Sequence, residues 1–129
     1  MNDIFLIDDD SLVNFLNKEI IKESFPQKNV TAFENASDAI NALKELATNP
    51  EKSIPQVILL DINMPIMDGW DFLDQFKDLS KEILASCRVI MHTSSIDPRD
   101  IEKAKTYTMV TDFISKPLTE QFLRQIFLR

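Results

Sequence analysis

Carboxylate, hydroxyl and amine side chains each follow an apolar, strand-like run of this sequence. The groups, with the run that each follows, are Asp8, Asp9 and Asp10 (residues 4–7), Asp61 (57–60), Thr93 (88–92) and Lys116 (112–115). If these runs are strands of one parallel sheet, their carboxyl ends meet at one edge, where such sheets bind ligands. Carboxylates gathered there repel one another and therefore require a cation or shifted pKa values.

This set of groups suits the transfer of a phosphoryl group. Carboxylate oxygens favour a hard ion such as Mg²⁺, which takes a few carboxylates together with water and phosphate oxygens. An Asp beside that ion can act as a nucleophile and form an acyl phosphate. Mg²⁺ can neutralise one phosphoryl oxygen and Lys116 a second, while the Thr93 hydroxyl hydrogen-bonds a third. We therefore expect a phosphate site that needs no glycine loop.

Strand-like runs alternate with amphipathic stretches along the whole chain. Besides the four runs above, residues 30–33 are a fifth expected strand, and the expected helices cover residues 11–24, 36–47, 69–79, 98–107 and 119–128, with a further helical turn at 80–86. Leu12, Val13, Leu16 and Ile20 form the apolar face of the first helix. Serial βα units predict an α/β, flavodoxin-like, doubly wound parallel sheet of five strands in the order 2-1-3-4-5, with five helices.

Composition excludes several classes of protein. The chain has 129 residues, 44% of them hydrophobic, which suits one domain with its own core. A net charge of −7 without a basic stripe argues against nucleic-acid binding. Gly69 is the only glycine, which argues against Walker A and dinucleotide-binding loops. Cys87 is the only cysteine, and no signal peptide or long apolar run is present, so we expect a cytoplasmic protein without membrane insertion.

Four stretches together resemble the response-regulator receiver family, of the stand-alone CheY-like type. They are FLIDDDS at residues 5–11, LLDINMPIMDG at 59–69, HTSS at 92–95 and FISKPL at 113–118. The resemblance covers the entire chain in order, and the central D-x-N-M-P-x-M-D-G stretch is highly specific. It implies that residues 1–129 are one receiver domain with no output domain.

The resemblance also implies a role for each acidic residue of the site. Asp61 matches the phosphoacceptor. Asp9 and Asp61 match direct Mg²⁺ ligands, and the backbone carbonyl of Asn63 matches a third. Asp8 matches the acid that reaches the metal, often through water.

The remaining matches concern the response to phosphorylation. Thr93 matches the switch hydroxyl, Lys116 the phosphate-binding lysine and Phe113 the aromatic residue whose rotamer follows phosphorylation. The family further implies a cis peptide bond before Pro117, which an X-Pro bond permits.

The function implied is that of a two-component signalling switch rather than an enzyme. A sensor histidine kinase or a histidine phosphotransfer protein supplies the phosphoryl group from a phosphohistidine. The switched surface then binds an unknown protein target, or the phosphate is passed on. We expect a monomer or a phosphorylation-dependent dimer, with no direct contact to nucleic acid.

Two alternatives remain at this point. In a haloacid-dehalogenase-like phosphatase, Asp8 would be the nucleophile and Asp10 its partner, but Asp61 would have no role. A degenerate receiver would act only as a binding module, which the intact Asp8, Asp9, Asp61, Thr93 and Lys116 argue against.

Other polar residues have structural interpretations. Asp10, Asp68 and Asp97 each precede an expected helix and are interpreted as N-caps. His92 alternates with Thr93 along a strand, so we expect it to point to the opposite face and to pack there. Cys87 lacks a basic partner other than its neighbour and is expected to be inert.

Overall fold

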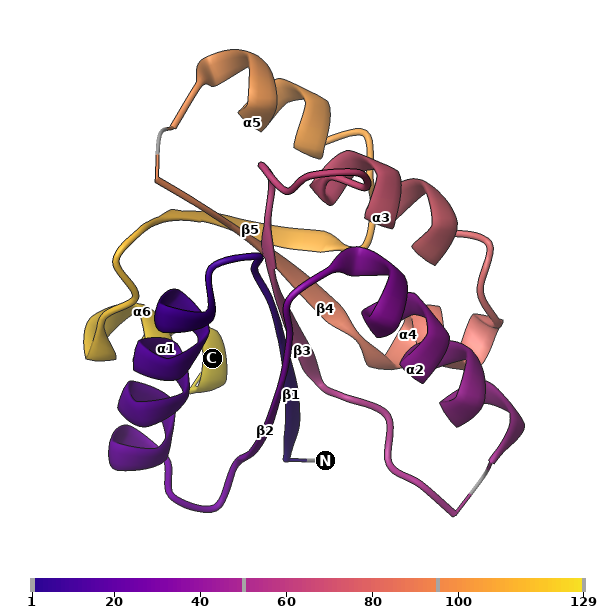
Figure 1. Ribbon diagram of the computed structural model, residues 1–129, viewed down its shortest axis with the longest axis horizontal. Coiled ribbons are helices and arrows are strands. Elements are labelled where there is room, and N and C mark those ends of the chain that lie inside the picture. Colours follow the sequence, from indigo (N-terminus) through magenta and orange to yellow (C-terminus); the bar gives the residue numbers. More distant parts are fainter. Residues whose placement is uncertain (1, 50, 95, 129) are drawn as a thin grey trace.

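Five parallel strands form the centre of the molecule (Figure 1). The computed structural model describes residues 2–49, 51–94 and 96–128. The strands are β1 (Asp3–Ile7), β2 (Asn29–Phe33), β3 (Val57–Asp61), β4 (Arg88–Thr93) and β5 (Val110–Ser115). They are hydrogen-bonded in the order β2-β1-β3-β4-β5, as expected. β3 is buried along its whole length, because helices cover both faces of its continuous apolar run.

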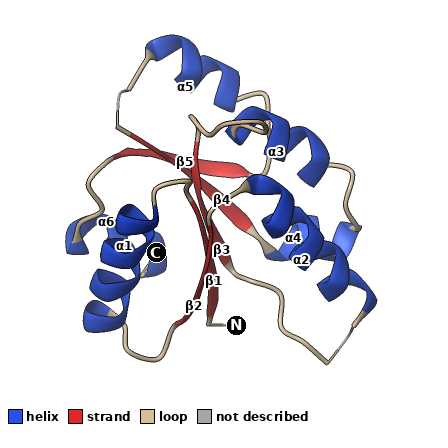
Figure 2. Ribbon diagram, viewed as in Figure 1, coloured by secondary structure: helices blue, strands red, loops and turns tan. Residues whose placement is uncertain are grey.

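Helices cover both faces of this sheet (Figure 2). They are α1 (Ser11–Ser24), α2 (Ala36–Thr48), α3 (Gly69–Phe76), α4 (Lys81–Ser86), α5 (Pro98–Ala104) and α6 (Glu120–Phe127). One core cluster packs beneath α1 and α6, and a larger one packs beneath the other helices. None of the helices in the described ranges is long and apolar enough to span a membrane.

The expected total of five helices was wrong, because α4 is a separate sixth helix within the described residues. The expected turn at 80–86 is that helix. The hydroxyl of Ser80 caps it by accepting a hydrogen bond from the backbone N–H of Ile83 at 3.3 Å. The side chain of Ile83 is fully buried, so burial of one large residue holds this short helix against the core.

The three aspartate caps are confirmed. Asp10 accepts a hydrogen bond from the backbone N–H of Leu12 at 3.0 Å, and Asp97 accepts one from that of Arg99 at 2.9 Å. Asp68 forms a reciprocal capping box with Asp71 at the start of α3. These caps begin α1, α3 and α5 directly after strand-end loops, which places the loops at the edge of the sheet.

The apolar face expected on α1 is not the face that packs on the sheet. Asn14, Asn17 and Ile21 are its buried residues. Leu12, Phe15 and Leu16 are instead 61%, 58% and 55% exposed, and Val13 and Ile20 are only partly buried. The prediction failed because α1 buries two asparagines, of which Asn14 hydrogen-bonds the carbonyls of Asp8 and Phe33.

Three boundaries also differ by more than one residue from those expected. β5 begins at Val110, two residues early, and α3 and α5 each end three residues early. The end of α5 has a local cause, since the ring of Tyr107 stacks on Trp70 with centroids 5.9 Å apart. The Tyr107 hydroxyl donates to the Asp74 carboxylate at 2.8 Å, which holds this residue against α3 instead of continuing the helix.

Candidate functional site

Three carboxylates converge where β1 and β3 end. Oxygen atoms of Asp8, Asp9 and Asp61 all lie within 4.8 Å of one another. Asp8 and Asp61 are 4% and 6% exposed, whereas Asp9 is exposed to solvent. β1 and β3 are direct neighbours in the sheet, with Ile7 opposite Leu60, so the residues that follow them meet at the same edge. The structure thus brings together the acids that the sequence predicted.

Lys116 supplies the positive charge of the site. Its Nζ atom lies 2.7 Å from the Asp8 carboxylate and 3.4 Å from that of Asp61. The peptide bond from Lys116 to Pro117 is cis, as expected. The backbone N–H of Lys116 donates to the carbonyl of Thr93 at 2.7 Å, which ties the end of β5 to the end of β4. The ammonium group therefore reaches the acids from a rigidly paired strand end.

Thr93 lies on the same edge and is 1% exposed. It ends β4, directly after His92, which pairs with Asp61 across β3 and β4. Ser95, the last residue of the HTSS stretch, lies outside the described residues. The four strand ends thus meet, with hydroxyl, ammonium and carboxylate groups at one edge of the sheet.

Sequence reasoning missed Asn14, which positions the loop that carries Asp8 and Asp9. Its side-chain amide donates to the carbonyl of Asp8 at 2.9 Å and to that of Phe33 at 3.2 Å. The backbone N–H of Asp8 also donates to the Phe33 carbonyl, at 3.1 Å. The only sequence signal was an asparagine within the apolar pattern of the first helix.

The loop after β3 folds back tightly on Asp61. The backbone N–H of Gly69 donates to the carbonyl of Ile62 at 2.8 Å. A Cβ atom on Gly69 would lie 2.7 Å from the carbonyl oxygen of Asp61, which is closer than atoms can pack. Gly69 is therefore needed for this approach. The same loop contains Ile66, whose φ of 70° is rarely adopted by a β-branched residue.

Burial and charge shift the pKa values of the central groups. Burial, and then the Asp8 charge, raise the pKa of Asp61 from 3.8 to about 6, although Lys116 acts in the opposite direction. Burial acts to lower the pKa of Lys116, but its hydrogen bond to Asp8 and the charges of Asp8 and Asp61 outweigh burial, and the net pKa is raised. The carboxylates therefore hold more negative charge than one ammonium group compensates.

This donor set fits a hard divalent cation. The three acids offer oxygen ligands only, close enough together to share one ion, and burial together with the Asp8 charge raises the pKa of Asp61. The backbone carbonyl of Asn63 was expected to be a further ligand of the metal, and that role stays a prediction. Asn63 itself is exposed, two residues beyond the end of β3.

Two other residues, His92 and Cys87, are buried as the sequence predicted. His92 is 2% exposed and lines a cavity with Val13 and Leu16, so it points to the α1 side of the sheet. Burial, and then the charge of Lys116, lower the pKa of His92 to about 4. Cys87 is buried, which raises its pKa to about 12 and makes it a poor nucleophile.

Phe113 is half-buried against the larger core cluster, and its expected rotamer switch stays a prediction.

Comparison with known proteins gives one consistent result. The family model described as "Response regulator receiver domain" matches residues 4–128. An uncharacterised response regulatory protein of Staphylococcus epidermidis is 29% identical over 125 residues, which are 95% of this chain but only 44% of that protein. The chain thus spans less than half the length of this curated relative.

Two solved structures resemble the fold over nearly the entire chain. A two-component response regulator from Cytophaga hutchinsonii is 36% identical, with a TM-score of 0.88 over 98% of this chain and 93% of that one. The phosphorylated cyanobacterial phytochrome response regulator RcpA is 27% identical, with a TM-score of 0.74 over 97% of this chain and 87% of that one.

Proposed function

This chain belongs to the response regulator receiver family, and from that premise we propose that Asp61 accepts a phosphoryl group in two-component signalling. The observation that carries the proposal is the convergence of Asp8, Asp9 and Asp61 within 4.8 Å, with the Lys116 ammonium 3.4 Å from Asp61. That a relative of the same fold has been solved in a phosphorylated form adds support.

In the proposed reaction, a carboxylate oxygen of Asp61 attacks the phosphorus of a phosphohistidine. The new P–O bond forms as the P–N bond breaks, and the imidazole nitrogen leaves with the electron pair and takes up a proton. With a pKa of about 6, Asp61 is mostly ionised and nucleophilic at neutral pH. Lys116 pairs with one phosphoryl oxygen, and the Thr93 hydroxyl donates a hydrogen bond to another.

Asp8, Asp9 and Asp61, with the carbonyl of Asn63, are the residues that would hold Mg²⁺. Bound there, the ion supplies positive charge that offsets the negative charge of the acids and of the phosphoryl group. The chain itself provides the acceptor and two of the stabilising groups. We therefore regard the protein as a phosphoacceptor that assists its own phosphorylation, not as an enzyme with many turnovers.

We further propose that the donor, a histidine kinase or a phosphotransfer protein, docks along α1. Leu12, Phe15 and Leu16 of this helix are each more than half exposed. A cavity of about 330 Å³ next to them reaches Lys116 and is lined mainly by apolar residues. Exposed apolar residues gathered in one patch are typical of protein-binding surfaces.

Phosphorylation would then change the surface formed by α5, β5 and α6. The Thr93 hydroxyl moves toward the phosphoryl oxygen in this scheme, and Phe113, already half-buried, turns into the space behind it. The changed surface would be bound by a downstream protein. Because the chain spans only part of its curated relatives, the partners and output of the whole protein are part of this proposal.

Acetyl phosphate with Mg²⁺ tests the central proposal. We expect a hydroxylamine-sensitive phosphoryl group on Asp61, located by mass spectrometry of peptides, and its loss in Asp61→Asn. Asp10→Asn, which keeps a capping side chain outside the acid cluster, should still be labelled. Label on Asp8 would instead favour the phosphatase alternative, and no label on the wild-type protein would favour a degenerate receiver.

A further inference from the structure

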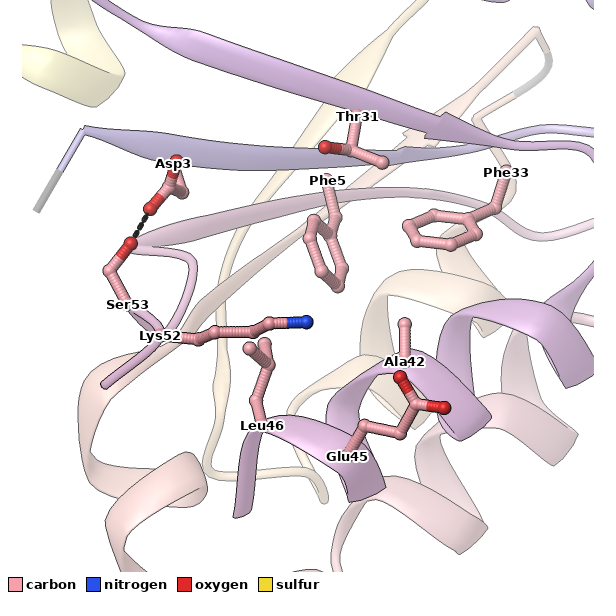
Figure 3. Close-up of a pocket in the computed structure, with 9 residues that line it drawn as sticks. All are labelled: Asp3, Phe5, Thr31, Phe33, Ala42, Glu45, Leu46, Lys52 and Ser53. Carbon is pink, nitrogen blue, oxygen red and sulfur yellow. Dashed lines mark hydrogen bonds between the residues drawn. The ribbon is translucent and has the colours of Figure 1, made fainter. Parts of the chain in front are cut away.

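A second cavity, away from the acidic site, lies between α2 and the uncovered edge of the sheet (Figure 3). Its volume is about 550 Å³, within the range of about 300–1,000 Å³ that is typical of sites for small organic ligands. The lining residues come from β1, β2, α2 and the loop that follows α2, and are Asp3, Phe5, Thr31, Phe33, Ala42, Glu45, Leu46, Lys52 and Ser53.

The cavity exists because β2 is an edge strand that α2 does not fully cover. The buried residues of α2 are Ala36, Ala39, Ile40 and Leu43, whereas Ala42 and Leu46 are only partly buried. Thr31 and Phe33 lie two residues apart on β2 and therefore face the same side of the sheet. The small side chain of Ala42 leaves space in front of them, between the helix and the strand.

The floor of the cavity is apolar and aromatic. The rings of Phe5 and Phe33 lie edge to face, with centroids 4.8 Å apart and an angle of 63° between their planes. Leu46 and Ala42 complete the surface from α2, as Figure 3 shows. Such a floor presents ring faces and edges to a flat apolar molecule.

The rim holds a cation that points over this floor. In Figure 3 the Lys52 side chain extends from the loop across the cavity, with its ammonium group near Phe5 and Leu46. No ion pair between described residues includes Lys52. The Asp3 carboxylate is engaged at the far end, where it accepts a hydrogen bond from the Ser53 hydroxyl. Lys52 is therefore placed to pair with an anion from outside the chain, while Glu45 lies on the opposite side of the rim.

We propose that this cavity binds a small, flat organic anion: a carboxylate or sulfonate carried on one or two rings. The rings would lie on Phe5, Phe33 and Leu46, and the anionic group would pair with the ammonium of Lys52. The Glu45 carboxylate repels an anion in the cavity. We therefore expect binding only of anions whose charged group reaches Lys52. This site goes beyond the proposed phosphorylation, because none of the acidic-site residues lines it.

Titration with naphthoate, followed by amide NMR shifts, tests the proposal. Saturable shifts should appear at Phe5, Thr31, Phe33 and Ala42. Lys52→Gln should weaken naphthoate binding about tenfold, since one charge-assisted hydrogen bond is lost. Glu45→Gln should strengthen it several-fold. Uncharged naphthamide should respond to neither substitution by more than about twofold.

Lys44→Gln is the matched control, because Lys44 is an exposed lysine of α2 that does not line the cavity. It should leave the binding of both probes unchanged. Shifts confined to α1 and to the loop after β5, or equal losses of naphthoate binding in Lys44→Gln and Lys52→Gln, would overturn the proposal. So would the absence of saturable shifts in a wild-type protein whose spectrum shows it to be folded.

Discussion

Burial and the neighbouring carboxylates both raise the pKa of Asp61. Its carboxylate is 6% exposed, lies beside Asp8 and Asp9, and has a pKa of about 6. The proton is thus bound more tightly in the folded state than at the ordinary value of 3.8. Below about pH 4 this preference stabilises the fold in full, and the stabilisation is lost as the pH rises through about 6. At neutral pH the ionised site therefore lowers the stability of the fold, and a bound cation can relieve this cost.

Asp61→Asn should therefore raise the free energy of unfolding at pH 7, measured by urea denaturation without divalent cations. We expect a gain of about 1–2 kcal/mol, after allowance for solvent screening, because the substitution removes a charge that burial and the neighbouring Asp8 both disfavour. The gain should shrink toward zero near pH 4, where wild-type Asp61 is protonated. Asp78→Asn, at an exposed position, serves as the control. A variant less stable than the wild type at pH 7 would contradict this account.

The backbone of Ile66 is strained, and its side chain gains no burial in return. It is fully exposed, and its φ of 70° places it in the left-handed region, which costs a residue with a Cβ atom roughly 1–2 kcal/mol. Asparagine adopts this conformation more readily.

Ile66→Asn should raise the free energy of unfolding by about 1 kcal/mol, because it relieves backbone strain and removes no buried contact. Ile66→Ala is the comparison, since alanine keeps most of the strain and should change stability by much less. Equal effects of the two substitutions in chemical denaturation would show that the gain does not come from the backbone.

Among the elements, α1 departs most from its sequence pattern. Buried Asn14 holds the carbonyls of Asp8 and Phe33, so this helix orders the acidic loop. The same orientation leaves Leu12, Phe15 and Leu16 exposed, and Leu16 lines a cavity together with Lys116 and Pro117. One helix thus positions the site with one face and presents an apolar surface with another.

Leu16→Gln should slow phosphoryl transfer from an autophosphorylated partner kinase about tenfold, because it removes apolar contact at the proposed docking surface. Phosphorylation by acetyl phosphate, which needs no docking, should be unchanged. Stability should change by less than about 0.5 kcal/mol, since the side chain is 55% exposed. Leu128→Gln, at a leucine that is 64% exposed on the C-cap of α6, is the control. Equal slowing with both donors would point to damage at the site instead.

For the whole molecule, negative charge and its placement set the response to cations. The net charge is −7, and three of the acids lie together at the edge of the sheet. A cation that binds only the folded state stabilises it by mass action. The fold therefore offers a direct readout of binding that does not depend on phosphorylation.

Mg²⁺ at about a hundred times its dissociation constant should raise the free energy of unfolding by about 2.7 kcal/mol, measured by thermal or urea unfolding. Asp9→Asn should remove most of this gain, because Asp9 is an exposed acid of the cluster and contributes little to the core. Asp100→Asn, an acid on α5 outside the cluster, should retain it. A gain that persists in Asp9→Asn would mean that the cation binds elsewhere.

The local pattern of the sequence was sufficient to predict the strands of the sheet and the convergence of the acidic residues at one edge of it. Parallel strands end at one edge, so Asp8, Asp61, Thr93 and Lys116 had to meet there once their apolar runs were recognised as strands. The helix N-caps at Asp10, Asp68 and Asp97 could also be predicted from the sequence, because capping depends on neighbours within a few residues. The specific D-x-N-M-P-x-M-D-G stretch added the family and the expected roles.

Contacts between segments that are distant in the sequence determined the features that the sequence did not predict. The buried face of α1 depends on Asn14 reaching the carbonyl of Phe33, and the end of α5 depends on Tyr107 packing against Trp70. The pKa of Asp61 and the cavity beneath β2 likewise depend on how strands and helices pack. Periodicity shows which residues of a helix share a face, but only packing against the rest of the chain determines where that face points.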